Sequence, residues 1–112
     1  MKVSFEEIGR LSVTFAAESG EAGQVCKVTG NAAVAPCAAD EVFCGVMEGI
    51  RGGFAGVQLH GFATVSYTGT APSVGYCNLV ADGNGGVKTG SSGRNYLVVN
   101  VDTTAQTATI EL

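Results

Sequence analysis

Regular patterning is strongest between Ala55 and Tyr67, where apolar and mostly polar residues alternate without a break. A period of two is typical of a β-strand that packs one face against a core. The apolar face would carry Ala55, Val57, Leu59, Gly61, Ala63, Val65 and Tyr67. The opposite face would carry Gly56, Gln58, His60, Phe62, Thr64 and Ser66. Glycines within residues 43–67 should divide the segment into short strands and allow the bends that a small barrel needs, so this segment predicts a β core.

Shorter alternating runs predict further strands at residues 11–15, 24–28, 32–35, 76–81, 87–89, 95–101 and 107–112. Gly, Asn and Asp between them predict tight turns at residues 29–32, 82–86 and 102–105. The residues expected to be buried are Val57, Leu59, Val65, Leu97, Val99 and Ile110. No segment keeps a helical period, so we expect at most one short helix, at residues 5–11 or 37–43. The predicted fold class is all-β, a small glycine-rich barrel or sandwich of short antiparallel strands.

The length of 112 residues is that of one domain. Residues 1–10 are the most charged part and have no clean period, so we expect an N-terminal arm or first element there and a single β domain over residues 11–112. A net charge of −4 with six scattered Lys and Arg argues against nucleic acid or an anionic membrane as a partner. A membrane-spanning helix needs a run of about 18 apolar residues, and the sequence has none, so no membrane span is predicted. A signal peptide has an apolar segment near its start, whereas this sequence has Glu6, Glu7 and Arg10 there. We therefore expect a protein made in a cytoplasm.

The chain has four cysteines, Cys26, Cys37, Cys44 and Cys77. They are expected to be free and mostly buried, because cysteine packs as a small hydrophobe and no secretory signal is predicted. Three disulfide pairings remain alternatives, and so does a zinc site, although no two cysteines have the close spacing that zinc sites use. Cys44 and Cys77 lie among apolar neighbours, which predicts a raised thiol pKa for both.

Few residues suggest catalysis. His60 is the one histidine, and its place in the middle of a strand predicts a surface or interface imidazole. Most carboxylates fall at predicted turns or within residues 1–10, and the glycine clusters lack the spacing and lysine of a phosphate loop. With no Trp and three Tyr, a stacking surface for sugars or bases is poorly supplied. We therefore predict no catalytic, cofactor-binding or metal-binding residue, no cofactor and no enzymatic activity.

Three stretches within residues 23–112 carry a resemblance to a known family. They are GQVCKVTGNAAVAPC with VFCGVMEGIRGGFAGVQLHGFATVSYTGTAPSVG, then LVADGNGGVKTG, and last YLVVNVDTTAQTATIEL. In this order they resemble the small head-decoration, or capsid cement, proteins of tailed phages and of prophages in gut Firmicutes. The matching motifs are glycine turns and alternating valines, so the resemblance lies in structural positions.

The resemblance implies a non-enzymatic structural protein on the outside of an expanded capsid, where it binds the major capsid protein. It also implies assembly in the bacterial host cytoplasm and a location on the virion, with a homotrimer as the expected oligomer. Phe5, Phe54 and Phe62 lie off the main core faces and would supply interface surface. Residues 1–10 are expected to contact the capsid. The alternative is a binding module associated with a phage tail or fibre.

Overall fold

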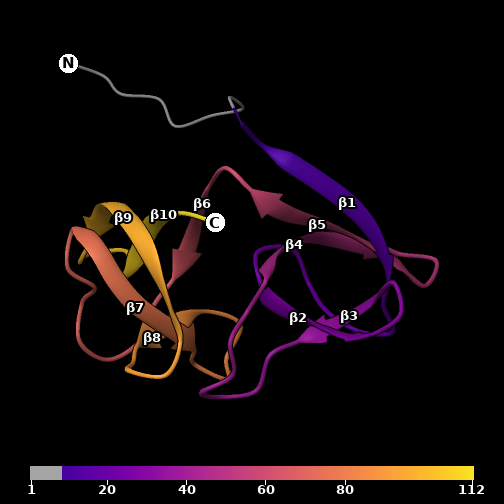
Figure 1. Ribbon diagram of the computed structural model, residues 1–112, viewed down its shortest axis with the longest axis horizontal. Coiled ribbons are helices and arrows are strands. Elements are labelled where there is room, and N and C mark those ends of the chain that lie inside the picture. The colour runs from indigo at the N-terminus through magenta and orange to yellow at the C-terminus, as the bar shows by residue number, and fades with distance from the viewer. Residues whose placement is uncertain (1–8) are drawn as a thin grey trace.

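The computed structural model describes residues 9–112, which form ten β-strands and no helix (Figure 1). A closed barrel has the strand order β1-β3-β2-β4-β5 and consists of β1 (Leu11–Ala16), β2 (Val25–Gly30), β3 (Ala33–Pro36), β4 (Gly45–Arg51) and β5 (Phe54–His60). The second sheet has the order β6-β10-β9-β7-β8 and consists of β6 (Phe62–Ser66), β7 (Gly75–Ala81), β8 (Val87–Thr89), β9 (Arg94–Asp102) and β10 (Thr107–Glu111). The predicted all-β class is confirmed.

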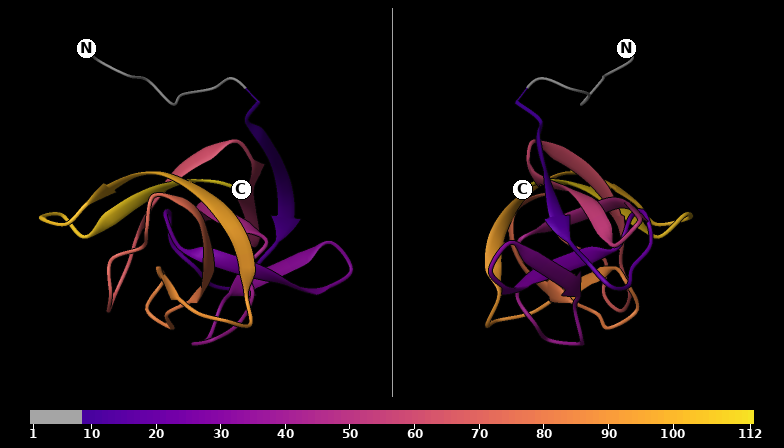
Figure 2. Two further views of the ribbon diagram at one scale, coloured as in Figure 1. Left: turned by 60° about the vertical axis from the view of Figure 1, so that its left-hand side comes forward. Right: turned by 90° about the vertical axis from the view of Figure 1, so that its right-hand side faces the viewer.

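Most strand pairs are antiparallel, as expected, but β1 and β3 pair in parallel, and Tyr67 forms a parallel bridge with Val87. Residues 37–43 form a loop, so the short helix considered there is absent. The other window for a helix, residues 5–11, lies mostly outside the described residues. Figure 2 shows the β9–β10 hairpin projecting beyond the rest of the second sheet.

The long alternation of residues 55–67 serves both sheets, because it is divided at Gly61 into β5 and β6. Gly61 has a φ of 96°, a left-handed conformation that L side chains rarely adopt. A Cβ at Gly61 would also lie 2.9 Å from the Cα of Arg10. On the predicted polar face, Gln58 is in fact buried, and its Nε2 donates to the carbonyls of His60 at 3.1 Å and Phe62 at 2.9 Å. These two bonds hold the bend where the chain passes between the sheets.

Two apolar cores result from this division. The barrel core contains Ala17, Cys26, Val34, Met47, Ala55 and Val57. The larger core contains Val25, Cys37, Phe43, Val46, Ala63, Val65, Tyr67, Leu79, Ala81, Val87, Tyr96, Val98, Ala108 and Ile110. Val25 and Val46 come from barrel strands, so the larger core packs the barrel against the second sheet. Alternate residues of one patterned segment thus contribute to both cores.

The three predicted turns are confirmed. Between β7 and β8, Asp82 Oδ1 accepts the amides of Asn84 at 2.6 Å and Gly86 at 3.1 Å. Between β9 and β10, Asp102 Oδ1 accepts the amides of Thr104 and Ala105, both at 3.0 Å. The β2–β3 turn contains Ala32 at a φ of 54°. In the β7–β8 and β9–β10 turns, aspartate side chains therefore accept amide hydrogen bonds from the residues that follow them.

The predicted burial is confirmed for Val57, Val65 and Ile110. It is wrong for Leu59, Leu97 and Val99. On β9 the core receives Tyr96 and Val98, whereas Leu97 and Val99 are only half-buried. The register against β10 shifts between Thr109, which pairs with Asn100, and Ile110, which pairs with Val98, so Val99 is skipped. Leu59 is half-buried for the same reason, because the β1–β5 register skips it. A strict period of two misassigns faces on either side of such bulges.

Candidate functional site

Among residues 9–112, no three His, Cys, Asp or Glu side chains are grouped so that they could hold a metal ion. His60 is exposed at the end of β5, in agreement with the prediction of a surface imidazole. Two other features of the described part of the chain have the geometry of functional sites. One is an open strand edge beside a groove, and the other is a pair of interacting thiols.

The open edge belongs to β1. One edge of β1 pairs with β5 along its whole length, from Leu11 to Ala16. The opposite edge meets β3 at one pair only, Ala16 with Ala33, where the Ala16 amide donates to the Ala32 carbonyl at 2.8 Å. Within the described residues, no strand pairs with the remaining length of that edge. The barrel is therefore closed at one end of β1 and open along the rest, which leaves a row of backbone groups able to bind another strand.

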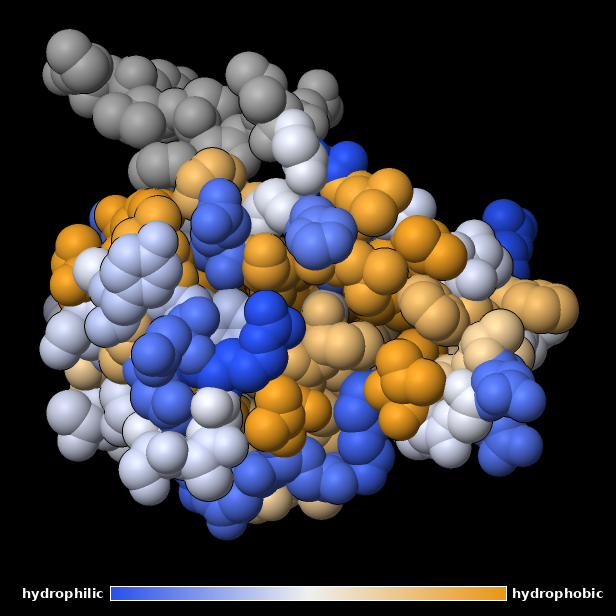
Figure 3. Space-filling view, viewed as in Figure 1, coloured by the Kyte–Doolittle hydropathy of each residue, from blue (hydrophilic) through white to orange (hydrophobic). Residues whose placement is uncertain are grey.

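Apolar side chains lie on this open part of β1. Val13 pairs with Val57 and Phe15 with Ala55, so these β1 residues share the face of the barrel core. Leu11 and Val13 are nevertheless 47% and 38% exposed, because no strand among residues 9–112 covers them on the open side. Figure 3 shows apolar residues gathered on the surface where β1 and β5 lie. An exposed edge combined with exposed apolar side chains is typical of an interaction surface.

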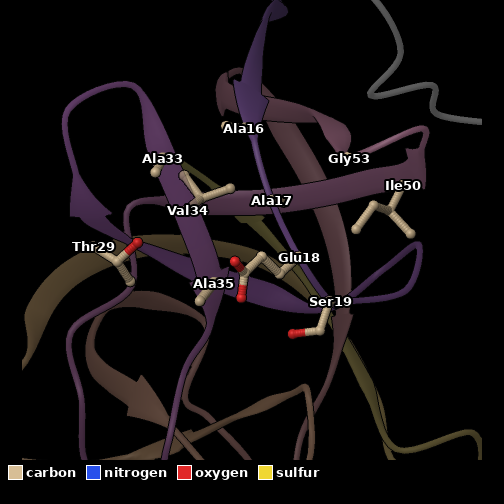
Figure 4. Close-up of a pocket in the computed structure, with 10 residues that line it drawn as sticks. All are labelled: Ala16, Ala17, Glu18, Ser19, Thr29, Ala33, Val34, Ala35, Ile50 and Gly53. Carbon is tan, nitrogen blue, oxygen red and sulfur yellow. The ribbon is translucent and has the colours of Figure 1, made fainter.

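A groove of about 780 Å³ lies at the closed end of β1 (Figure 4). Its lining comes from the end of β1 and the residues after it, from β2, β3 and β4, and from the β4–β5 turn. It consists of Ala16, Ala17, Glu18, Ser19, Thr29, Ala33, Val34, Ala35, Ile50 and Gly53. Most of these side chains are small and uncharged, and the one charged lining residue is Glu18. An apolar or basic segment therefore suits the groove better than an acidic one.

An ion pair fixes the start of β1 on the barrel. Arg10 donates to the carboxylate of Glu48 on β4, and Ser12 Oγ donates to the same carboxylate oxygen at 2.9 Å. The hydrogen bond from Arg10 is the main reason that the pKa of Glu48 is lowered. Arg10, the last residue of the predicted arm, is thus anchored to the barrel. Residues 1–8 of that arm lie outside the described residues.

The thiol pair joins Cys26 on β2 to Cys44, which directly precedes β4. The Cys44 amide donates to the Cys26 carbonyl at 2.8 Å, and the Cys44 side chain packs against the barrel core that contains Cys26. Hydrogen bonding from the Cys26 thiol, helped by backbone donors at Cys44 and Val28 and by the charge of Arg94, lowers the pKa of Cys44 to about 7. The prediction of a raised Cys44 pKa is therefore wrong, because local donors outweigh burial.

The other thiols differ from Cys44. The pKa of Cys26 is raised by its hydrogen bond with Cys44 and by burial, and burial raises the pKa of Cys37 to about 11. Cys77 lies half-buried on β7, where its Sγ donates to the Asn78 carbonyl at 3.8 Å. All four cysteines are free in the structure. Cys44 is thus the thiol whose surroundings favour the reactive thiolate.

The aromatic residues expected at an interface have different environments. Phe54 is 58% exposed at the start of β5, whereas Phe62 is half-buried on β6. Phe5 lies outside the described residues. Sequence reasoning missed both the open edge and the thiol pair, because each depends on which strands become neighbours. Nothing in the sequence indicates that Leu11, Val13 and Phe15 pair with one strand instead of two.

No helix in the described part of the chain is long and apolar enough to cross a membrane.

No protein-family model matches this sequence, and no curated protein is similar enough to it to count as a match.

Proposed function

We propose that this chain is a non-enzymatic decoration protein of a tailed-phage or prophage head, which binds the major capsid protein on the outside of the capsid. The observation that carries the proposal is the open edge of β1, with Leu11 and Val13 exposed on it. A protein that braces a shell needs a rigid domain with an edge that can bind the shell. The all-β fold and the sequence resemblance support the same role.

Strand addition is the mode of binding that this edge supports. An extended segment of a capsid subunit would pair with the free backbone groups of β1, and its alternate side chains would cover Leu11 and Val13. Backbone hydrogen bonds supply affinity in such complexes, and side-chain pockets supply specificity. The groove at the closed end of β1 would receive the continuation of the added segment.

Co-sedimentation with expanded capsids of the phage that encodes the chain tests this proposal. The full chain is expected to bind, and Val13→Lys is expected to weaken binding at least about tenfold by placing a charge in the contact. Val74→Lys is the matched control, because Val74 is 71% exposed on the loop before β7, away from the β1 edge. Absence of binding by the full chain would refute the decoration role. Equal binding by the two variants would refute the β1 edge as the contact.

Removal of residues 1–8 tests the predicted arm separately, since Arg10 and its ion pair with Glu48 then remain. Weaker binding of a truncated but folded chain supports a capsid contact in the arm, and unchanged binding assigns the contact to the β1 edge alone. Self-association as a trimer belongs to the same proposal and is measured by light scattering. The second candidate, a module associated with a phage tail or fibre, is favoured if the chain binds purified tails but not capsids.

A further inference from the structure

We propose that Cys44 and Cys26 form a redox-active dithiol, in which Cys44 reacts with a hydroperoxide and Cys26 then closes a disulfide between β2 and β4. The inference does not depend on the proposed capsid role. It rests on the placement of one thiol on β2 beside another that directly precedes β4, on the donors around Cys44 and on the difference in exposure between the two cysteines.

Backbone geometry brings the two cysteines within reach of a disulfide. Cys26 is the register partner of Gly45, the residue that follows Cys44. The hydrogen bond of 2.8 Å from the Cys44 amide to the Cys26 carbonyl joins the two residues directly. A backbone hydrogen bond of this kind keeps two residues of adjacent chain segments side by side, the arrangement that a disulfide between them requires. Both side chains also face the same core, since Cys26 is buried in the barrel core and Cys44 packs against it.

The structure also holds Cys44 rigidly in place. Phe43 stacks on Tyr96 with ring centroids 4.7 Å apart, and the Tyr96 hydroxyl donates to the Phe43 carbonyl at 2.9 Å. Arg94, which lies over the Tyr96 ring, adds a positive charge near the sulfur. Cys44 is therefore fixed on both sides, by β2 through Cys26 and by β9 through the residue before it.

The two thiols differ in the way that a two-step oxidation requires. Cys44 is half-buried and so within reach of a small oxidant, whereas Cys26 is 0% exposed. The Cys26 thiol donates its proton to the Gly45 carbonyl at 3.6 Å. The neighbouring Cys44 and burial raise the pKa of Cys26, so Cys26 remains protonated until Cys44 has been oxidised.

The chemistry balances with one hydroperoxide. The Cys44 thiolate attacks the terminal oxygen, the O–O bond breaks, and Cys44 becomes a sulfenic acid while the leaving oxygen takes a proton. The Cys26 sulfur then attacks the Cys44 sulfur, the S–O bond breaks, and the departing hydroxide takes the Cys26 proton as water. Two thiols are oxidised to one disulfide, and hydrogen peroxide, where it is the oxidant, is reduced to two waters. The new bond encloses β3 and ties β2 to the start of β4.

The ionisable groups around Cys44 come from three elements. They are Cys26 on β2, Arg94 and Tyr96 on β9, and Cys37 in the loop that follows β3, which itself lies near Glu41 and Lys27. The native protein should therefore show Cys44 alkylated by iodoacetamide at pH 7 roughly tenfold faster than Cys37, because alkylation requires the thiolate. Unfolding the chain should remove the difference.

Oxidation of the intact protein by one equivalent of hydrogen peroxide, followed by peptide mapping, tests the proposal. Wild type should form a Cys26–Cys44 disulfide that dithiothreitol reverses. Cys26→Ser should stop at a sulfenic acid on Cys44, which dimedone traps, and Cys44→Ser should leave Cys26 as a thiol. Cys77→Ser, the matched control on β7, should behave as wild type.

Two results would overturn the proposal. One is oxidation of Cys37 or Cys77 before Cys44 in the wild-type protein. The other is a folded wild-type protein in which no bond forms between Cys26 and Cys44 although Cys44 has been oxidised. Because both readouts come from the unmodified sequence, failure of a variant to fold does not affect them, and circular dichroism establishes which variants are folded.

Discussion

Replacement of Gln58 by Met should destabilise the protein more than any nearby exposed substitution. Gln58 is 4% exposed, and its side chain donates to the carbonyls of His60 at 3.1 Å and Phe62 at 2.9 Å. Met keeps the length of the side chain but removes both bonds. The His60 carbonyl lies near solvent and can bind water instead, so loss of its bond should lower the free energy of unfolding by about 0.5–1 kcal/mol. The Phe62 carbonyl is more buried, so loss of its bond should lower it by about 1–3 kcal/mol. Allowing for the apolar side chain that is buried instead, the expected loss is about 2–3 kcal/mol.

Urea unfolding followed by circular dichroism measures this loss, and thermal unfolding gives a second reading. A loss of 2–3 kcal/mol should lower Tm by roughly 8–13 °C for a domain of this size. Gln106→Met is the matched control, because Gln106 is exposed in the β9–β10 turn. A loss below about 0.5 kcal/mol for Gln58→Met, or one equal to that of the control, would refute the role assigned to the bend between the sheets.

The remaining predictions concern single contacts. Gly93→Ala should cost more than about 2 kcal/mol in thermal unfolding, because its Cβ would lie 2.0 Å from the Leu79 carbonyl oxygen, whereas Gly30→Ala meets no atom within 4 Å and should be nearly neutral. Tyr96→Phe should cost about 1–2 kcal/mol in urea, through loss of its buried hydroxyl bond of 2.9 Å, and equal stability would contradict this. Glu48→Gln should cost about 0.5 kcal/mol at pH 7. The folded-state pKa of Glu48 is below its ordinary value of 4.5. The stability difference between wild type and Glu48→Gln should therefore be complete above pH 4.5 and vanish as the pH falls through the lowered pKa. A stability difference that does not change with pH would contradict the ion pair.

Local features of the fold were predictable from the sequence. Turn residues such as Asp82 and Asp102 act within a few residues of themselves, so their hydrogen bonds follow from local sequence. The alternation of residues 55–67 likewise predicts correctly that the side chains of Val57 and Val65 are buried. These features depend on the chain's own geometry and not on which strands become neighbours.

Features that depend on strand neighbours were not predictable. The same alternation would describe one long strand or two, and the bend at Gly61 depends on contacts such as the packing of Arg10 against it. The skipped residues Leu59 and Val99 have ordinary β-forming side chains, so nothing in their sequence indicates a bulge. Faces predicted by period alone are therefore correct only up to the nearest register shift.

The candidate sites show the same limit. The environment of Cys44 includes Cys26, Val28 and Arg94, which are distant from it in sequence or lie on another strand. Apolar neighbours in the sequence suggested a raised pKa, whereas donors brought by the fold lower it. The open edge of β1 similarly follows from its pairing with β3 at Ala16 alone. Sequence patterns locate strands and turns, and the fold decides which backbone edge and which thiol become available.

Amide hydrogen exchange across β1, compared between the free protein and the protein bound to expanded capsids, tests the central claim most directly. Residues 11–15 should exchange readily in the free state at amides on the open edge, because no described strand pairs with it, and should become protected on binding. The β9–β10 hairpin, which lies on the other sheet, should exchange equally in both states. Bound protein whose β1 exchanges at an unchanged rate, with protection elsewhere, would contradict the assignment of β1 as the capsid-binding edge.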